Sequence, residues 1–306
     1  MQHYHSNGKL LLFGEYFVLE GAKALAIPTQ LGQSLTITPQ TFLVKGLNWK
    51  SFDHEGKLWF EAYFDETLDI KHTTDAEVAR TLQTILFAAK QLNPNLLQGD
   101  FYYDAETRLQ FPRQWGLGSS STLIANIAQW AQVDAFNLFF NSFKGSGYDI
   151  ACAISPQPII YQLKEEKALW HTVNFAPAFA ENIAFVYLGK KQNSREGIQH
   201  FRQKSRQLSR ETELISTITQ KALNCSTIDG FMALMGEHEE IVAHALELSK
   251  VKGIYFSDFE GEIKSLGAWG GDFVMAAARL PFNDIKNYFI NKGFTTIVPY
   301  NEMRRH

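Results

Sequence analysis

The segment from Gly116 to Ser121, GLGSSS, joins two glycines and three serines to a helical pattern that carries no charge until Asp134. Glycines let backbone N–H groups approach a ligand closely, and a helix N-terminus favours negative charge. The segment could therefore bind phosphate. Taken alone, it could equally be a strand-to-helix turn capped by serines. A dinucleotide loop needs a third glycine and a distant acidic residue, and a Walker-type loop needs a lysine after the glycines, so neither fits.

Two charged residues beside glycines could act on a bound phosphate. Lys9 follows Gly8 and precedes an apolar run. It is either a plain charge at a strand edge or a fixed cation where negative charge develops. Asp149 follows the sequence GSGY at 145–148 and precedes a helix of small residues. It is either the cap of that helix or a base that orients a substrate hydroxyl and accepts its proton.

Two later segments could complete such a site. The sequence GAWGGD at 267–272 precedes an apolar strand pattern, and on its own it is simply a loop that needs positive φ angles. Lys190, Lys191 and Arg195 follow another strand pattern, with Ser194 as an added hydrogen-bond donor. Arginine grips phosphate through two parallel hydrogen bonds and lysine acts as a point charge. This cluster could hold a substrate phosphate, or it could be the solvated basic start of a helix.

The elements that must position these residues mix strands and helices without a regular βαβ rhythm, which favours an α+β fold. Before the glycine–serine segment we expect a bent strand pair at Leu10–Phe13 and Tyr16–Leu19, a hairpin within 41–64 and a helix at Asp75–Leu92 with Asp75 as its N-cap. Further expected elements are strands at 101–103, 109–111, 158–163, 183–188, 273–278 and 295–298, and helices at 120–133, 194–224, 227–249 and 282–291.

Composition limits the classes of function. The 306 residues can form two domains, and the net charge of −3 argues against nucleic acid as a partner. Two cysteines make no disulfide framework, and no apolar run approaches the roughly 18 residues of a membrane span. We therefore expect a cytoplasmic protein with no membrane partner. The expected oligomeric state is a monomer or a homodimer. His238 and His244 lie six positions apart and do not share a helix face as a metal pair would. The acidic run 237–240 is interpreted as a solvated helix face.

Taken together, the segments at 8–9, 116–120 and 267–271 resemble the three motifs of the GHMP small-molecule kinase superfamily, in the family's order. This resemblance implies a two-domain α+β fold. Its N-terminal ATP-binding domain, residues 1–176, would be a left-handed βαβ domain, and its C-terminal domain, residues 177–306, would be ferredoxin-like. It also implies a kinase that uses ATP and Mg²⁺ and phosphorylates a small molecule.

The resemblance assigns roles residue by residue. It implies Asp149 as the catalytic base, Lys9 as the catalytic cation and Ser120 as the magnesium ligand. ATP contacts are implied for Gly116, Leu117, Gly118, Ser119, Ser120 and Ser121. Acceptor contacts are implied for Lys9, Glu15, Tyr16, Ser146, Gly147, Lys191, Ser194, Arg195, Gly267, Ala268, Gly270 and Gly271.

Within the superfamily, the sequences GEY at 14–16, GSGYD at 145–149 and GGD at 270–272 are most similar to mevalonate-pathway kinases, to phosphomevalonate kinases before mevalonate kinases. The implied reaction transfers the γ-phosphoryl group of ATP to phosphomevalonate or mevalonate, a step of isoprenoid precursor synthesis. Two alternatives stay open: a sugar or amino-alcohol kinase of the same superfamily, and a ligand sensor without catalysis. The chain departs from the family pattern at Trp269, and only 29 positions separate Ser120 from Asp149, with no acidic residue at 135–148.

Overall fold

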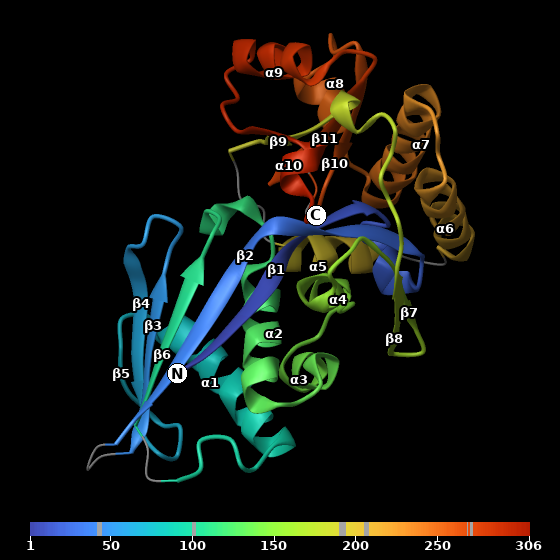
Figure 1. Cartoon of the computed structure of the whole chain (residues 1–306). Helices are drawn as coiled ribbons and strands as arrows, with labels where there is room; N and C mark the ends of the chain where they lie inside the picture. Colours follow the sequence, from blue (N-terminus) through green and yellow to red (C-terminus); the bar gives the residue numbers. More distant parts are fainter. Residues whose placement is uncertain (42–44, 100–101, 190–193, 205–207, 268, 270–271) are drawn as a thin grey trace. The chain divides into compact units, whose positions relative to one another are not determined.

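The computed structural model describes the whole chain except residues 42–44, 100–101, 190–193, 205–207, 268 and 270–271 (Figure 1). It divides into two compact units. Unit 1 comprises Met1–Gly8, Leu31–Arg113 and Leu117–Ile154, and unit 2 comprises Lys9–Gln30, Gln114–Gly116 and Ser155–His306. Strands β1 (Gln2–Phe13) and β2 (Ala24–Gln40) each run from one unit into the other. The predicted domains 1–176 and 177–306 stay a prediction.

The described part of unit 1 contains a sheet in the order β5-β4-β3-β6-β2. Its strands, besides β2, are β3 (Gly46–Phe52), β4 (Leu58–Phe64), β5 (Ile70–Thr73) and β6 (Tyr102–Leu109). Strands β3 and β4 form the hairpin expected within 41–64. The two short strands expected near β6 are one strand. Its buried residues Ala105, Thr107 and Leu109 alternate with charged ones, so the pattern of a half-buried strand continues across the charges.

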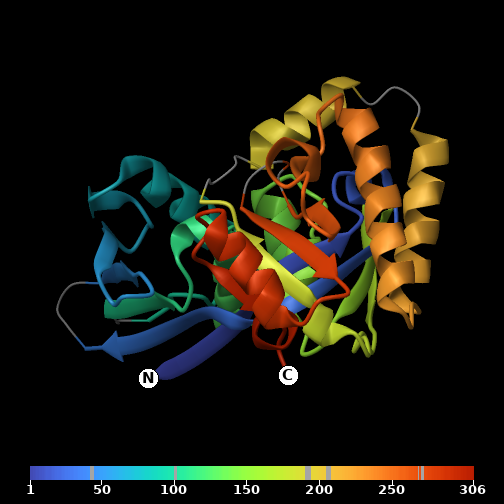
Figure 2. The same cartoon turned by 90° about the horizontal axis from the view of Figure 1, so that it is seen from above.

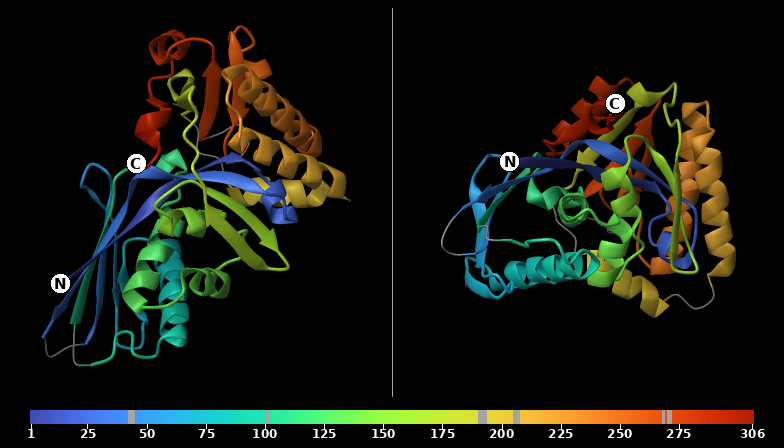
Figure 3. Two further views of the ribbon diagram at one scale, coloured as in Figure 1. Left: turned by 45° about the vertical axis from the view of Figure 1, so that its right-hand side comes forward. Right: turned by 60° about the horizontal axis from the view of Figure 1, so that its bottom comes forward.

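Helices α1 (Ala76–Leu92), α2 (Ser119–Ala131), α3 (Ala135–Ser142) and α4 (Tyr148–Ile154) complete unit 1. Asp75 caps α1 as predicted, accepting hydrogen bonds from the N–H groups of Glu77 and Val78. Helix α1 packs against α2 and α3 (Figure 3). Apolar side chains of α1 and α2 join Trp49 and Phe60 of the sheet in one buried core. This core holds the middle and the C-terminal half of α2 against the sheet.

The described part of unit 2 contains a four-stranded antiparallel sheet in the order β10-β11-β9-β12. These strands are β9 (Ile183–Tyr187), β10 (Gly261–Ser265), β11 (Phe273–Ala278) and β12 (Ile297–Pro299). A second group joins β2 to β7 (Ile159–Lys164) and β8 (Lys167–Thr172). The helices are α5 (Ser194–Lys204), α6 (Ser209–Leu223), α7 (Ile228–Leu246), α8 (Val251–Tyr255), α9 (Phe282–Asn291) and α10 (Tyr300–Met303). Helices α6 and α7 lie side by side (Figure 2), and α7 packs on β10.

The sequence pattern missed several elements. The apolar run at Tyr16–Leu19 is not a strand, because Tyr16 and Gly14 both have positive φ angles and turn the chain into a 3₁₀ helix at Phe17–Glu20. The pattern at 194–224 contains two helices, α5 and α6. Strands β5, β8 and β10 and helices α3, α8 and α10 were not predicted. Among the described residues, no helix combines the length and the apolar run that crossing a bilayer requires.

Candidate active site

The glycine–serine segment opens α2 as predicted. Gly118 is the N-cap residue in a left-handed conformation, and Ser121 Oγ returns a hydrogen bond to its carbonyl at 2.9 Å. The first N–H groups of a helix have no partner within the helix, and the first turn of α2 contains no acidic residue. Leu117 is fully buried, whereas Ser120 is exposed. The segment therefore combines a fixed backbone with an accessible helix N-terminus that suits an anion.

Buried hydrogen bonds hold α2 on the strands beneath it. Thr122 Oγ1 donates to Gln33 Oε1 of β2 at 2.6 Å, and Asn126 Nδ2 donates to the Gln33 carbonyl at 2.9 Å. Ser6 Oγ of β1 donates to Asn126 Oδ1 at 2.9 Å. Because a buried polar group is costly unless it is paired, these bonds fix the helix in position as well as stabilising it. No local sequence signal identified them.

Asp149 lies at the second position of α4, half-buried, in unit 1. Its Oδ1 accepts a hydrogen bond from the N–H of Ile150 at 3.1 Å, and Ile150 itself is part of the unit 1 core. Gly147 has a φ of +82°, which turns the chain into the helix. Helix α4 packs against α2. The carboxylate is therefore held by a short helix whose own packing depends on the helix that the glycine–serine segment opens.

In unit 2 the structure brings together one residue from each of the first two glycine motifs, Lys9 and Gly116, and Asp272, which directly follows the third motif. Lys9 Nζ donates a hydrogen bond to the Gly116 carbonyl at 2.9 Å. Gly116 has a φ of +67°, and a Cβ added there would collide with the carboxylate of Asp272. Asp272 is itself almost buried and has a φ of +49°. Three segments that are far apart in the sequence thus meet at the residue that begins the glycine–serine segment.

Glu15 lies in a buried cluster of charged groups, 3% exposed. Its Oε1 lies 2.5 Å from Lys264 Nζ of β10, and its Oε2 lies 3.3 Å from His238 Nε2 of α7. The same His238 nitrogen accepts a hydrogen bond from the Gly14 N–H at 2.9 Å. Burial raises the pKa of Glu15, against the effect of the Lys264 ammonium, and lowers the pKa of His238 well below its usual range. His238 is therefore neutral and carries its hydrogen on Nδ1.

The interpretation of 237–240 as a solvated helix face is wrong for its central residues. His238 and Glu239 are buried, whereas Glu237 and Glu240 are exposed. Glu239 accepts hydrogen bonds from the N–H and the hydroxyl of Ser265 at 3.1 and 2.9 Å, and burial raises its pKa to about 7. The signal was present in the sequence: the buried α7 residues recur at helical spacing. They are Phe231, Met235, His238, Glu239, Val242 and Leu246.

Tyr16 is hydrogen-bonded to Trp269, a described residue of the late glycine loop at 267–271. Its Oη accepts a hydrogen bond from the backbone N–H of Trp269 at 2.9 Å, and its ring lies 5.5 Å from that of Phe201 in α5. The Trp269 indole Nε1 donates to the Ser249 carbonyl at 3.1 Å. Burial raises the pKa of Tyr16, so the phenol is neutral. The expected contacts of Glu15 and Tyr16 with an acceptor stay predictions.

The other predicted residues are placed only in part. Lys191, Ala268, Gly270 and Gly271 lie outside the described residues. Ser194 and Arg195 begin α5, but only their backbone is described. Ser146 and Gly147 are buried at the start of α4, and Gly267 has a φ of +71°. Within the described ranges, no three His, Cys, Asp or Glu side chains gather as metal ligands would.

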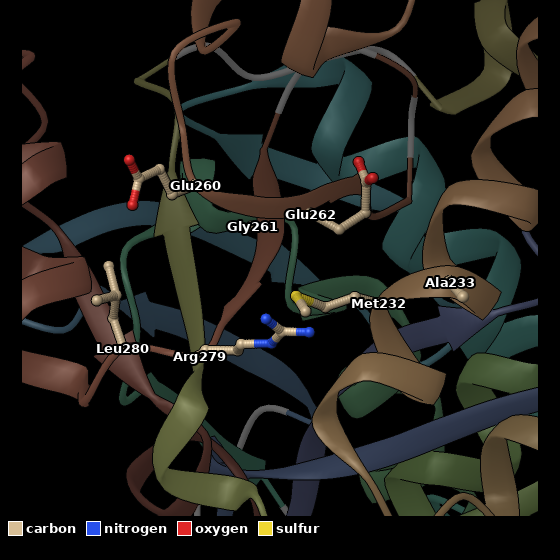
Figure 4. A pocket seen from close by; sticks show the side chains of 7 residues that line it. All are labelled: Met232, Ala233, Glu260, Gly261, Glu262, Arg279 and Leu280. Carbon is tan, nitrogen blue, oxygen red and sulfur yellow. The ribbon is translucent and has the colours of Figure 1, made fainter.

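A hollow of about 440 Å³ in unit 2 contains none of the predicted residues. Figure 4 shows Arg279 reaching toward Met232, while the carboxylates of Glu260 and Glu262 point away from it. Arg279 Nε already forms an ion pair with Asp229 at 2.6 Å. This hollow is therefore not an obvious anion site.

Comparison with solved structures tests the fold. No protein-family model and no curated protein matches the chain. A Streptococcus pneumoniae phosphomevalonate kinase, in complex with phosphomevalonate and AMPPNP, is similar in structure with a TM-score of 0.73 and 16% identity, over 98% of this chain and 100% of that one. Methanococcus jannaschii mevalonate kinase has a TM-score of 0.70 and 16% identity, over 100% of this chain and 98% of that one. Lactococcus lactis galactokinase, complexed with galactose, has a TM-score of 0.65 and 14% identity, over 100% of this chain and 95% of that one. The chain therefore has the two-domain α+β fold of the GHMP kinases, as its three glycine motifs predict.

Proposed function

We propose that the chain is an ATP-dependent kinase that transfers the γ-phosphoryl group to a small acceptor, phosphomevalonate before mevalonate. The observation that carries the proposal is the hydrogen bond from Lys9 to Gly116, beside Asp272. It joins a cation to the segment that suits phosphate, beside the residue that directly follows the third motif. The structural likeness to phosphomevalonate and mevalonate kinases supports it.

The phosphates of ATP would lie at the N-terminus of α2. Backbone N–H groups from Gly116 to Ser121 and the positive end of the helix would bind them. The exposed hydroxyl of Ser120 fits a ligand of Mg²⁺, an ion that usually keeps several waters and needs few protein ligands. When bound, Mg²⁺ would neutralise charge on the phosphates.

Two side chains would act on the transferred group. Asp149 would orient the acceptor hydroxyl and accept its proton, a role in which a positioned base contributes about 10²- to 10⁴-fold. Lys9 would stabilise the negative charge that develops on the phosphoryl oxygens. Phosphoryl transfer depends mainly on such positioning and charge stabilisation, so this set of residues is chemically sufficient.

The basic cluster at the start of α5 favours an acceptor that already carries a phosphate. Lys190, Lys191, Ser194 and Arg195 supply three cations and one hydroxyl within six positions. Replacing Arg195 with Ala should raise KM for phosphomevalonate, because the bidentate contact is lost, and should change KM for mevalonate much less. An unchanged KM for phosphomevalonate would remove the cluster from the acceptor site.

The test is an ADP-release assay with mevalonate, phosphomevalonate and a panel of sugars and amino alcohols. We expect turnover with phosphomevalonate above all. Turnover with a sugar alone would favour the alternative of a sugar kinase, which the structural similarity to a galactokinase supports. ATP binding without turnover on any acceptor would favour the non-catalytic sensor. The presence of both Lys9 and Asp149 argues against a sensor, which has no need of either. We also propose a cytoplasmic monomer or homodimer.

A further inference from the structure

Tyr16 has a backbone conformation that residues other than glycine rarely adopt, with φ 62° and ψ −49°. Such a conformation is costly and persists only where the surroundings enforce it, which is common at functional sites. Tyr16 is 7% exposed and directly follows the charged cluster around Glu15. Its unusual backbone places a large side chain within unit 2, where the segment around Trp269 and helix α5 meet it.

The phenol oxygen of Tyr16 contacts two of these segments at once. It accepts the hydrogen bond from the Trp269 N–H in the late glycine loop at 2.9 Å. On the side of α5, a Cβ added at Gly197 would lie 2.9 Å from the same oxygen, closer than real Cβ contacts allow. Because glycine has no Cβ, Gly197 lets the backbone of α5 approach the phenol oxygen this closely.

The neighbouring contacts hold both segments against the Tyr16 ring. Phe201 of α5 is fully buried, 5.5 Å from the Tyr16 ring centre, and His200 Nε2 hydrogen-bonds the Leu246 carbonyl at 2.8 Å. The Trp269 indole packs on the same apolar cluster and is anchored to the Ser249 carbonyl. The Trp269 segment and helix α5 are therefore both packed against the Tyr16 side chain.

We propose that Tyr16 is a positioning residue that sets the late glycine loop and α5 in register and so shapes the acceptor part of the site. This inference rests on the proposed function. Ser194 and Arg195 lie three and two positions before Gly197, and Gly267 lies two positions before Trp269. A shift of the phenol oxygen would therefore move the start of α5, with Ser194 and Arg195, together with the segment of Gly267 and Trp269. In this role Tyr16 acts through Trp269 and Gly197.

The experiment combines Tyr16→Phe, Gly197→Ala and the double variant. Tyr16→Phe keeps the ring and removes the acceptor oxygen. We expect KM for the acceptor to rise about three- to tenfold, as loss of one internal hydrogen bond would give, with KM for ATP within about twofold. Gly197→Ala should raise the acceptor KM similarly, because the new Cβ displaces the phenol oxygen.

The double variant gives the sharpest test. Without the oxygen, the nearest Tyr16 atoms to a Cβ at position 197 are ring carbons at 3.4 and 3.6 Å, which are ordinary contacts. Gly197→Ala should therefore add nothing in the Tyr16→Phe background. Tyr288→Phe is the matched control, since it also removes one tyrosine hydrogen bond, to Asp258 at 2.7 Å, and should leave both KM values unchanged.

A second readout does not depend on catalysis. Selective ¹⁵N labelling of the six tryptophans allows amide exchange at Trp269 to be followed alone. It should accelerate about three- to tenfold in Tyr16→Phe, because that amide loses its acceptor. Unchanged exchange, an unchanged acceptor KM, or additive effects in the double variant would each overturn the proposal. A wild-type protein without turnover would instead overturn the proposed kinase, and the exchange result would still decide whether Tyr16 holds the loop.

Discussion

Lys9 Nζ donates a hydrogen bond to the Gly116 carbonyl oxygen at 2.9 Å, although 107 positions separate the two residues. The bond fixes the place of the ammonium group at the start of the glycine–serine segment. It does not neutralise the charge, because a carbonyl carries no net charge. The arrangement suits a cation that must meet a phosphate in a set position, since electrostatic stabilisation is strongest when the charge is fixed in advance.

Replacing Lys9 with Met should lower kcat about 10²- to 10³-fold, as loss of one fixed charge-stabilising group does. The fold should survive, because the lost hydrogen bond to a neutral carbonyl is worth about 1 kcal/mol and Glu15, which Lys9 also influences, keeps its nearer cation Lys264. Lys252→Met is the matched control, since Lys252 Nζ also donates to a glycine carbonyl, that of Gly261, at 2.6 Å. Steady-state kinetics check both variants. A Lys9→Met enzyme within threefold of the wild-type kcat would refute the role.

Asp149→Asn should lower kcat about 10²- to 10⁴-fold while ATP binding is kept. The amide oxygen of Asn can still accept the hydrogen bond from the Ile150 N–H, so α4 should begin as before. Asp134→Asn serves as control, because Asp134 caps α3 through the Asn137 N–H at 2.8 Å and has no proposed catalytic role. Nucleotide binding by calorimetry and turnover by ADP release separate the two effects. Full activity of Asp149→Asn would mean that another group accepts the proton.

Gly116→Ala should destabilise the protein and raise KM for ATP. Alanine at a φ of +67° costs roughly 1–2 kcal/mol, and its Cβ must also displace the Asp272 carboxylate, which adds about 1–3 kcal/mol. Gly56→Ala separates the two costs, because Gly56 has a φ of +79° and open space around it. Unfolding in urea should therefore show the larger loss for Gly116→Ala. Asp272→Gly should recover part of that loss in the double variant, and equal losses at positions 56 and 116 would argue against the close packing of Gly116 and Asp272.

Local patterns in the sequence predicted what depends on local chemistry. Asp75 and the apolar period after it located α1, and glycines beside charged residues located Lys9, Gly116 and Asp149. The pairing of these residues could not be predicted, because it depends on contacts between distant segments. Lys9 with Gly116, Tyr16 with Trp269 and Glu15 with Lys264 are separated by more than 100 positions each.

The error at 237–240 has a specific physical cause. Charged residues are expected to face water, and four consecutive polar residues suggest an exposed face. Helix α7 packs on β10, whose Lys264 is itself fully buried, so the charges of the two elements compensate one another inside unit 2. Only the period of the surrounding apolar residues, such as Met235 and Val242, points inward at this position. At this position the helical spacing of the apolar residues predicted burial better than the charge of the individual side chains did.

The carboxyl group of Glu239 should make the wild-type protein less stable as the pH rises. Burial raises its folded-state pKa to about 7 from a reference of 4.5, so the folded protein binds more protons than the unfolded chain between these values. The stabilising contribution is complete below about pH 4.5 and is lost as the pH rises through about 7. Lys264 and Glu15 contact the same cluster, and neutral His238 gives the opposite dependence, since its pKa is lowered.

Comparison with Glu239→Gln isolates this contribution, because the other groups of the cluster are common to both proteins. Gln stays neutral and can still accept the hydrogen bonds from Ser265. Relative to wild type, the variant should therefore gain roughly 2–3 kcal/mol between pH 5 and pH 8. Glu240→Gln is the control, because Glu240 is exposed and its pKa is lowered by Lys250, so it should show no such gain. Urea unfolding at the two pH values measures the difference, and a stability difference that stayed constant with pH would mean that Glu239 is already ionised at pH 5.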